Sequence, residues 1–225
     1  MNAVRNYQKE LDKIIDKIAE QKAAWTTGGM SAGTKEEPMP PELFLHSCCA
    51  PCSSYVLEYL SNYFRITVFY YNPNISPEAE YVQRVQELKR LIEEMPLRHP
   101  VAFQEGAYEP ERFYEMARGM ETLPEGQERC FACYRLRLGE AAIIAKAGNY
   151  DYFTTTLSIS PLKNAQKLNE IGNQVGQEQG IAFLPSDFKK RNGYKRSLEL
   201  SAEYHLYRQN YCGCVFSKRE DTAQE

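Results

Sequence analysis

The sequence predicts an α/β protein in which a parallel sheet is flanked by helices. After residue 41, strand-like and helix-like segments alternate, which is typical of a parallel sheet with right-handed crossovers. The clearest strand, at 66–71, is a near-continuous β-favouring run, as expected for a strand buried on both faces. A length of 225 residues with 43% hydrophobic and 25% charged side chains suits one sizeable domain.

The N-terminal region is expected to lie outside that domain. Residues 5–22 place apolar side chains near a helical period among charged ones, which predicts a helix packed on the domain surface. Residues 26–41 are rich in Gly, Ser, Thr and Pro, a linker composition. We therefore divide the chain into a helix and flexible linker (1–40), a single α/β domain (41–216) and a polar tail (217–225).

The first half of the domain follows a β-α-β-α-β pattern. The apolar run at 43–45 predicts a strand, and a cysteine-bearing loop at 46–52 leads into an amphipathic helix. After the strand at 66–71, Ser76 is expected to cap a helix with Pro77 at its first position. That helix covers 78–94, ends before Pro96 and precedes a short strand around 99–103.

The second half continues the alternation. We expect a helix at 109–119, a polar loop at 121–128 and a long helix that begins at the second cysteine group, runs to Ala147 and ends with Gly148 at C′. A strand at 152–156 precedes a helix capped by Ser160-Pro161 and running to Ile171. A strand at 181–184, a basic loop at 189–196 and a helix from 197 to about 207 follow.

Charge and hydropathy exclude several classes of protein. A formal net charge of −3 argues against a globally basic nucleic-acid binder, so any such footprint must be local. No run approaches the roughly 18 apolar residues of a membrane span. The N-terminus lacks the apolar core of a signal peptide. We therefore expect a reducing, cytoplasmic setting without membrane contact.

The seven cysteines fall into three groups, and this odd number disfavours a complete disulfide framework. The groups are Cys48-Cys49-x-x-Cys52, Cys130-x-x-Cys133 and Cys212-x-Cys214. The first lies at a helix N-terminus, which lowers thiol pKa and favours anions. Because loops at the carboxyl ends of parallel strands meet at one sheet edge, we expect the groups to converge there.

The thiols leave several chemistries open. A closed zinc site takes four thiolates and leaves three unexplained. An iron–sulfur cluster held by Cys48, Cys49, Cys130 and Cys133, with Cys52, Cys212 and Cys214 beside it, uses every thiol. The Cys-x-Cys pair suits either a mononuclear metal or an oxidising disulfide. A thioredoxin-like oxidoreductase is less consistent with the sequence, because it needs only one Cys-x-x-Cys.

Seven sequence features, in order between about residues 40 and 216, resemble the epoxyqueuosine reductases of the QueH family. They are His-x-Cys-Cys-Ala-Pro-Cys-Ser (46–53), Tyr-Asn-Pro-Asn-Ile (71–75), the helix with Glu80, Tyr81 and Arg84, Arg-Cys-x-x-Cys-Tyr-x-x-Arg-Leu (129–138), Thr-Thr-Thr-Leu-x-x-Ser-Pro-x-Lys (154–163), Lys-Lys-Arg-x-Gly-Tyr-x-Arg-Ser (189–197) and Tyr-Cys-Gly-Cys (211–214). The resemblance does not cover the N-terminal helix and linker.

The resemblance implies that the epoxide of epoxyqueuosine, in the wobble position of a tRNA anticodon, is reduced to the alkene without cobalamin. It implies a [4Fe-4S] cluster beside a second mononuclear iron or a redox-active thiol pair, and an electron donor such as ferredoxin or flavodoxin. The order of elements also resembles the Rossmann-like PP-loop (HUP-like) arrangement. The Ser-Gly-Gly-x-Asp-Ser loop of such ATP users is absent, which argues against ATP chemistry.

The expected site combines these implications with the positions of the residues. Cys48, Cys49, Cys130 and Cys133 are the expected cluster ligands; Cys212 and Cys214, with Cys52, form a second metal site or a redox pair; Asp187 is a proton donor or ligand. His46 either orients a ligand or is merely packed. Tyr134 and Arg135 either meet the substrate or serve the helix surface.

A local basic segment supplies the expected tRNA contact. Lys189, Lys190, Arg191, Lys195 and Arg196 are its cations, and Tyr194 offers a ring on which an unpaired base can stack. The alternative interpretation of these charges is a solvated face. Two rival functions remain at this stage: a zinc-stabilised tRNA-binding module without catalysis, and a PP-loop-like tRNA-modifying enzyme that depends on ATP.

Overall fold

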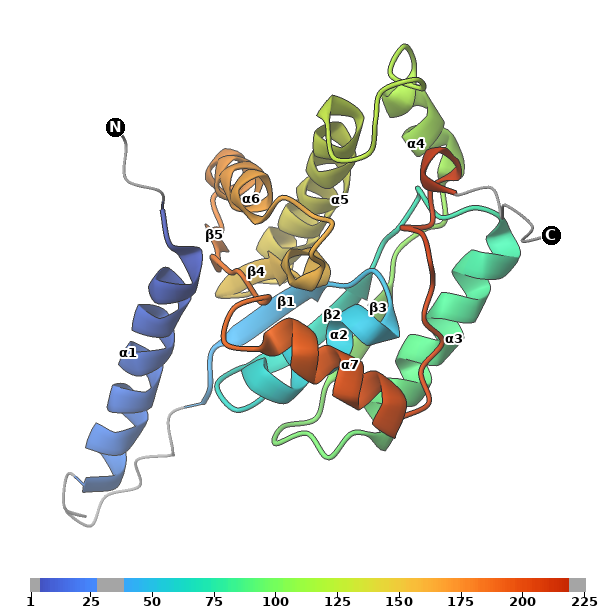
Figure 1. Ribbon diagram of the computed structural model, residues 1–225. Coiled ribbons are helices and arrows are strands. Elements are labelled where there is room, and N and C mark those ends of the chain that lie inside the picture. The colour runs from blue at the N-terminus through green and yellow to red at the C-terminus, as the bar shows by residue number, and fades with distance from the viewer. Residues whose placement is uncertain (1–4, 28–38, 219–225) are drawn as a thin grey trace.

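A five-stranded parallel sheet forms the centre of the computed structural model, which describes residues 5–27 and 39–218 (Figure 1). The strands are β1 (Glu42–His46), β2 (Arg65–Tyr70), β3 (Ala102–Glu105), β4 (Tyr152–Thr155) and β5 (Ala182–Phe183). Their spatial order is β3-β2-β1-β4-β5, and all four neighbouring pairs are parallel. This is the doubly wound, Rossmann-like order. The predicted fold class is confirmed.

Strand β1 explains why the sequence forms this sheet. It pairs with β2 on one side and β4 on the other, so residues 43–46 are fully buried. Leu43 and Leu45 pack into one core cluster and Phe44 into the other, because alternate side chains point to opposite faces. A continuous apolar run is what a strand covered on both faces requires.

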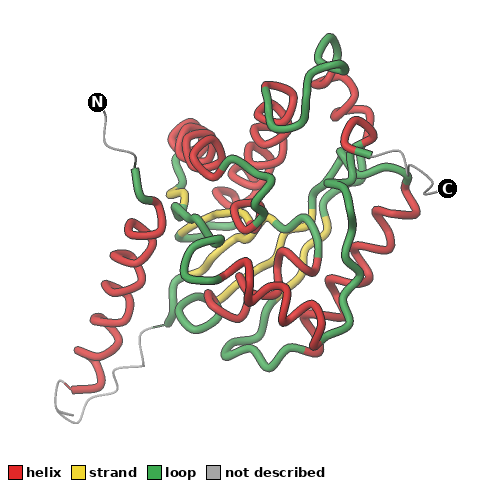
Figure 2. Tube along the Cα trace, viewed as in Figure 1, coloured by secondary structure: helices red, strands yellow, loops and turns green. Residues whose placement is uncertain are grey.

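Helices cover both faces of the sheet (Figure 2). One face carries α2 (Ala50–Leu60), α3 (Glu78–Glu94) and α7 (Gly193–Glu203); the other carries α5 (Glu128–Ala147) and α6 (Ala165–Gln179), with α4 (Pro110–Ala117) against α5. Two 3₁₀ turns, η1 (Thr156–Ile159) and η2 (Val215–Ser217), complete the elements. No helix in the described part of the chain is long and apolar enough to cross a membrane.

Helix α1 (Tyr7–Thr27) continues five residues beyond the predicted end at 22. Leu11 and Ile15 are buried in the core cluster that also holds residues of α2. Arg191 Nη2 lies 2.6 Å from Asp12 Oδ2 and ties the helix to the segment before α7. The predicted surface helix is therefore packed against the α/β unit. Most of the expected linker, 28–38, lies outside the described residues.

Several predicted boundaries differ from the structure. Pro77, not Ser76, is the cap residue of α3. Asn164 caps α6 by accepting a hydrogen bond from the Lys167 amide, whereas Ser160-Pro161 lies in the preceding turn, after η1. Helix α6 then continues to Gln179. The left-handed residue after α5 is Asn149, at φ 57°, rather than Gly148.

Three further boundaries differ from those predicted. Strand β3 begins at Ala102, three residues later than expected, and the second half of the predicted basic loop is already helical, because α7 begins at Gly193. Ser217, assigned to the polar tail, is buried and belongs to η2. Residues 219–225 lie outside the described part of the chain.

Candidate metal and redox site

The first cysteine group occupies the junction between β1 and α2. Cys48 and Cys49 follow the end of β1, and Cys52 lies in the first turn of α2. Their three Sγ atoms lie within 4.8 Å of one another, and those of Cys48 and Cys49 are 3.7 Å apart. Hydrogen bonds from Cys49 and Cys52 lower the pKa of the Cys48 thiol well below its usual range. Three neighbouring sulfur ligands, one of which is stabilised as a thiolate, fit a bound metal group.

The second group lies at the start of α5, as the sequence predicts. Cys130 and Cys133 are both buried, and the Gly126 amide donates a hydrogen bond to Cys130 Sγ at 3.2 Å. The loop before them is folded by the buried Arg129, whose Nη1 donates to the Met120 and Glu121 carbonyls at 2.9 Å each. Arg129 therefore fixes the approach of the chain to the two thiols.

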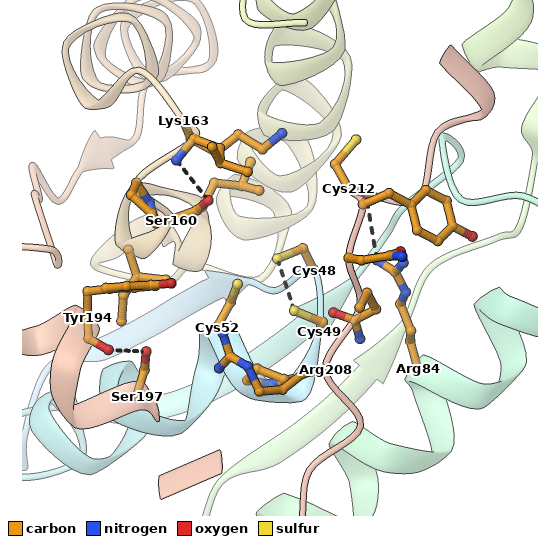
Figure 3. A pocket seen from close by; sticks show the side chains of 18 of the residues that line it. Cys48, Cys49, Cys52, Arg84, Ser160, Lys163, Tyr194, Ser197, Arg208 and Cys212 are labelled. Atoms are coloured by element: carbon orange, nitrogen blue, oxygen red, sulfur yellow. Dashed lines mark hydrogen bonds between the residues drawn. The ribbon is translucent and has the colours of Figure 1, made fainter. Parts of the chain in front are cut away.

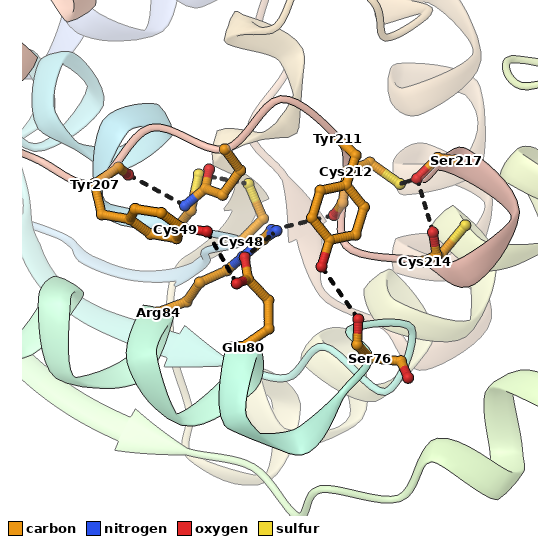
Figure 4. A network of polar contacts seen from close by, with 11 residues as sticks. Cys48, Cys49, Ser76, Glu80, Arg84, Tyr207, Tyr211, Cys212, Cys214 and Ser217 are labelled. Atoms are coloured by element: carbon orange, nitrogen blue, oxygen red, sulfur yellow. Dashed lines mark hydrogen bonds and ion pairs between the residues drawn. The ribbon is translucent and has the colours of Figure 1, made fainter. Parts of the chain in front are cut away.

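The third group lies on the segment that follows α7 and crosses to the start of α3 (Figure 4). Cys212 Sγ lies 3.0 Å from the Ser217 hydroxyl oxygen, and that hydroxyl donates to the Cys214 carbonyl at 2.9 Å. A hydrogen bond from Cys214 lowers the pKa of Cys212. All seven cysteines lie within the described residues and are free thiols.

Two cavities bring the three groups together. The larger, of about 200 Å³, is lined by Cys48, Cys49, Cys52 and Cys212 (Figure 3). The smaller, of about 20 Å³, is lined by Cys130, Cys133, Cys212 and Cys214. Cys212, Arg137 and Lys163 line both cavities. The cysteine groups therefore meet, as the topology predicts, beside the point where the chain leaves β1 and β4 in opposite directions.

Cations outnumber acids around the larger cavity. Arg84, Arg137, Lys163 and Arg208 line it, and Glu125 is the one carboxylate among the lining residues. Lys163 Nζ lies 3.1 Å from Glu125 Oε1. Burial is the largest single influence on the pKa of Lys163 and lowers it, but Cys212, Tyr134 and Glu125 together raise the pKa, so the ammonium group stays protonated. This positive field favours thiolates and other bound anions.

Arg137 connects the cavity to the end of β1. Its Nε donates to His46 Nε2 at 3.3 Å, and its Nη2 donates to Asn72 Oδ1. Burial, and then the charge of Arg137, lower the pKa of His46 to about 3, so the imidazole is neutral at pH 7. His46 Nδ1 lies 2.8 Å from Thr155 Oγ1, and Nε2 lies 3.1 Å from the Tyr71 carbonyl oxygen. His46 therefore orients Arg137 rather than facing the thiols.

The smaller cavity contains polar atoms that suit a bound group. Asn74 Oδ1 and the Tyr134 hydroxyl are buried, and neither has a hydrogen-bond partner within the described residues. Both residues line this cavity beside Cys130, Cys133 and Cys214. Buried polar atoms are normally paired, so these two are consistent with a polar or metal-bound occupant. Together with the thiols and cations, these residues fit a metal-bound group.

The remaining predicted residues occupy different places. Asp187 Oδ1 lies 3.0 Å from Lys189 Nζ, and Asp187 is absent from the lining of both cavities. Tyr194 lines the larger cavity. Arg135 is on the surface, 2.8 Å from Glu178. Within the basic segment, Arg191 pairs with Asp12 and Arg196 with Glu58, each at 2.6 Å, while Lys190 and Lys195 are exposed.

An ion-pair network that sequence reasoning did not anticipate holds the third cysteine group (Figure 4). Arg84 Nη1 donates to the Cys212 carbonyl at 3.2 Å, and its Nε donates to Glu80 Oε1 at 2.7 Å. The Tyr207 hydroxyl donates to Glu80 Oε2 at 3.0 Å, and the guanidinium lies 5.4 Å from the centre of the Tyr211 ring. Arg84 thus connects α3 to the segment that carries Cys212.

Other site residues were also missed. Arg137 and Lys163 stand in the quoted motifs, but their roles depend on tertiary contacts. Arg208 had no local signal, because it is an isolated cation in an irregular segment. The sequence therefore indicates the thiols directly, but not the cations that surround them.

The fold and the site define an α/β protein with a thiol-rich, cationic site suited to a metal or redox group. The family model described as Epoxyqueuosine reductase QueH matches residues 43–220. The chain is 40% identical over 218 residues to epoxyqueuosine reductase QueH of Staphylococcus epidermidis, covering 95% of this chain and 87% of that one. It is 42% identical over 187 residues to the protein of that name from Streptococcus pyogenes serotype M1, covering 82% and 73%. The chain belongs to the QueH family.

Proposed function

We propose that this protein is an epoxyqueuosine reductase that converts the epoxide in the tRNA wobble nucleoside to the alkene. The observation that carries this proposal is the meeting of all three cysteine groups around one cationic site, in a chain of the QueH family. In the reaction both carbon–oxygen bonds of the epoxide break and a carbon–carbon double bond forms. Two electrons and two protons are consumed, and the oxygen leaves as water.

The thiols divide between two proposed centres. Cys48, Cys49, Cys130 and Cys133 hold a [4Fe-4S] cluster, and Cys212 and Cys214, with Cys52, hold a second iron or act as a redox pair. This division follows the family resemblance; in its support, Cys212 lines both the cavity beside Cys48 and Cys49 and the cavity beside Cys130 and Cys133, so a second centre at Cys212 would border both pairs of cluster ligands. When bound, these groups supply electrons and Lewis acidity for removal of the oxygen.

The chain's own residues prepare the site. Arg137 lies beside Cys133 and partly offsets the burial that raises the pKa of this thiol. Arg84 fixes the peptide of Cys212. Lys163 lies between the two cavities with a protonated ammonium group. The side chains of Leu157 and Ile159 form an apolar part of the wall, which limits water beside the reacting carbon atoms.

The partners follow from the reaction. Because the chain needs external electrons, a small carrier such as ferredoxin or flavodoxin is the proposed donor, and no cobalamin is required. The exposed Lys190 and Lys195, together with Tyr194 at the cavity, support the proposed tRNA contact. A tRNA substrate places the reaction in the cytoplasm.

A single-turnover experiment tests the proposal. Anaerobically purified, reduced protein is incubated with tRNA that carries epoxyqueuosine, and the nucleosides are analysed by mass spectrometry. We expect the loss of one oxygen atom without added ATP, and no loss with Cys48→Ser. Intact protein that binds the tRNA but leaves the epoxide unchanged would refute the reductase and favour a binding module. Conversion that depends on ATP would favour a PP-loop-like enzyme.

A further inference from the structure

The mouth of the larger cavity lies between two segments that are distant in sequence (Figure 3). One side is the turn at 160–163, in which Leu162 is 61% exposed. The other side is formed by Tyr194, in the first turn of α7, and by the segment 208–212. An aliphatic side chain and an aromatic ring at one opening suit the faces of an unstacked base.

Arg208 differs from every other cation that lines this cavity. Arg84 and Lys163 each pair with a carboxylate, and Arg137 is buried among hydrogen-bond acceptors. Arg208 is exposed, and within the described residues it has no acidic partner. Its charge is therefore uncompensated at the opening of the site.

The Arg208 guanidinium is nevertheless held in place. Its Nη1 donates to the Ser201 hydroxyl at 3.1 Å, and that buried hydroxyl donates to the Ser197 carbonyl at 2.6 Å. Both serines belong to α7, the helix that also carries Tyr194. One helix therefore orients the free cation and the aromatic ring. An oriented guanidinium loses less side-chain entropy when it binds an anion.

The basic segment predicted from the sequence is more strongly compensated. Lys189 pairs with Asp187, Arg191 with Asp12 and Arg196 with Glu58, at 3.0, 2.6 and 2.6 Å. A phosphate that approaches these three cations also meets the neighbouring carboxylates, which reduces the attraction. Local charge balance therefore favours Arg208 over those cations.

We propose that Arg208 is a phosphate-binding residue of this site. Its guanidinium contacts the backbone phosphate of the nucleotide whose base enters the cavity between Leu162 and Tyr194. The planar fork of arginine matches two phosphate oxygens, and a charge-assisted contact of this kind releases counterions from the RNA. This inference rests on the proposed function for the identity of the RNA.

Salt-dependent binding of an anticodon stem-loop RNA tests the inference. Fluorescence anisotropy with an unmodified, wobble-guanosine RNA is measured for the wild type and for Arg208→Gln, Arg208→Lys and Arg65→Gln. Arg65 is the matched control, because it is an exposed arginine at the start of β2, the opposite end of the strands. For Arg208→Gln we expect an affinity loss of about tenfold and a slope of log K against log[salt] smaller by about one.

The other variants make the outcome decisive. Arg208→Lys should retain most of the slope, and Arg65→Gln all of it. A wild-type slope in correctly folded Arg208→Gln would overturn the assignment, and so would an equal loss in Arg191→Gln. Failure of the wild type to bind the RNA would overturn the assignment, and the proposed function would fall only if tRNA that carries epoxyqueuosine also stayed unconverted. Conversion of the epoxide by wild type together with an unchanged Arg208→Gln slope would refute this inference alone.

Discussion

Replacing Arg84 by alanine should both destabilise the protein and release Cys212. The Arg84 side chain is 2% exposed and that of Glu80 is 10% exposed, so the variant leaves a buried carboxylate without its cation. The substitution also removes the donor to the Cys212 carbonyl and the cation that lies over Tyr211. No other contact in the network replaces the lost charge, because Tyr207 supplies Glu80 only with a neutral hydroxyl.

The expected cost follows from this burial. Removing one partner of a buried ion pair costs about 3–5 kcal/mol of unfolding free energy. The matched control is Arg135→Ala, whose ion pair with Glu178 is 46% and 40% exposed and should contribute about 0–1 kcal/mol. Replacing both partners, with Glu80→Gln and Arg84→Met, should cost less than the sum of the single variants, because no unpaired charge stays buried.

Two assays check this prediction on metal-free protein. Urea unfolding measured by circular dichroism gives the free-energy change for each variant. Alkylation by iodoacetamide, followed by peptide mass spectrometry, gives the reactivity of Cys212 in the folded state. We expect faster alkylation of Cys212 in Arg84→Ala and an unchanged rate in Arg135→Ala. An Arg84→Ala protein within about 1 kcal/mol of wild type, with unchanged Cys212 reactivity, would show that this network does not position the third cysteine group.

Three further perturbations follow from the same structure. Gly213→Ala places a Cβ at φ +107° and 2.8 Å from Ile75 Cγ1, so the urea midpoint should fall by the equivalent of about 1–3 kcal/mol; no change would contradict the strained geometry. Cys48→Ser and Cys130→Ser should each lose cluster iron and acid-labile sulfide after anaerobic purification, and retention of both by either variant would remove that thiol from the ligand set. Burial raises the pKa of Tyr59 to about 12, so its contribution to stability is present below about pH 10 and lost as the pH rises toward 12. Tyr59→Phe should therefore lose less stability than wild type between about pH 9 and 11 in urea titrations, and an equal loss would contradict that assignment.

The fold could be predicted because its signals are local. Strands β1 and β2 contain largely apolar, buried runs, and the apolar spacing of 78–94 gives α3 its observed bounds. The start of α7 could not be predicted in this way. Gly193 suggests a loop, yet it is required because the helix approaches Phe188 and Tyr55 so closely that a Cβ would collide with them. Likewise, Asn164 rather than Ser160 caps α6, because Ser160 ends the 3₁₀ turn η1 and the helix begins only at Ala165.

In the candidate site too, residues with a local sequence signal could be predicted and residues placed by long-range contacts could not. Cysteine spacing identifies all seven thiols, because short-range spacing is what metal and redox chemistry requires. The cations depend on long-range contacts, since the segment that carries Arg208 and Cys212 follows α7, which packs on α2, and lines the cavity beside residues of the β1–α2 loop, α2 and η1 that are distant in sequence. For Asp187, predicted as a proton donor or ligand, the structure shows an ion pair with Lys189 at 3.0 Å, a partner that its spacing alone did not indicate.

The metal content of anaerobically purified protein tests the central claim, the assembly of three cysteine groups into one iron–sulfur site, most directly. Iron, zinc and acid-labile sulfide are measured per chain, and the reduced protein is examined by electron paramagnetic resonance. We expect iron and sulfide in the proportions of a [4Fe-4S] cluster, and a cluster signal on reduction. Colourless protein with stoichiometric zinc and no sulfide would contradict the claim.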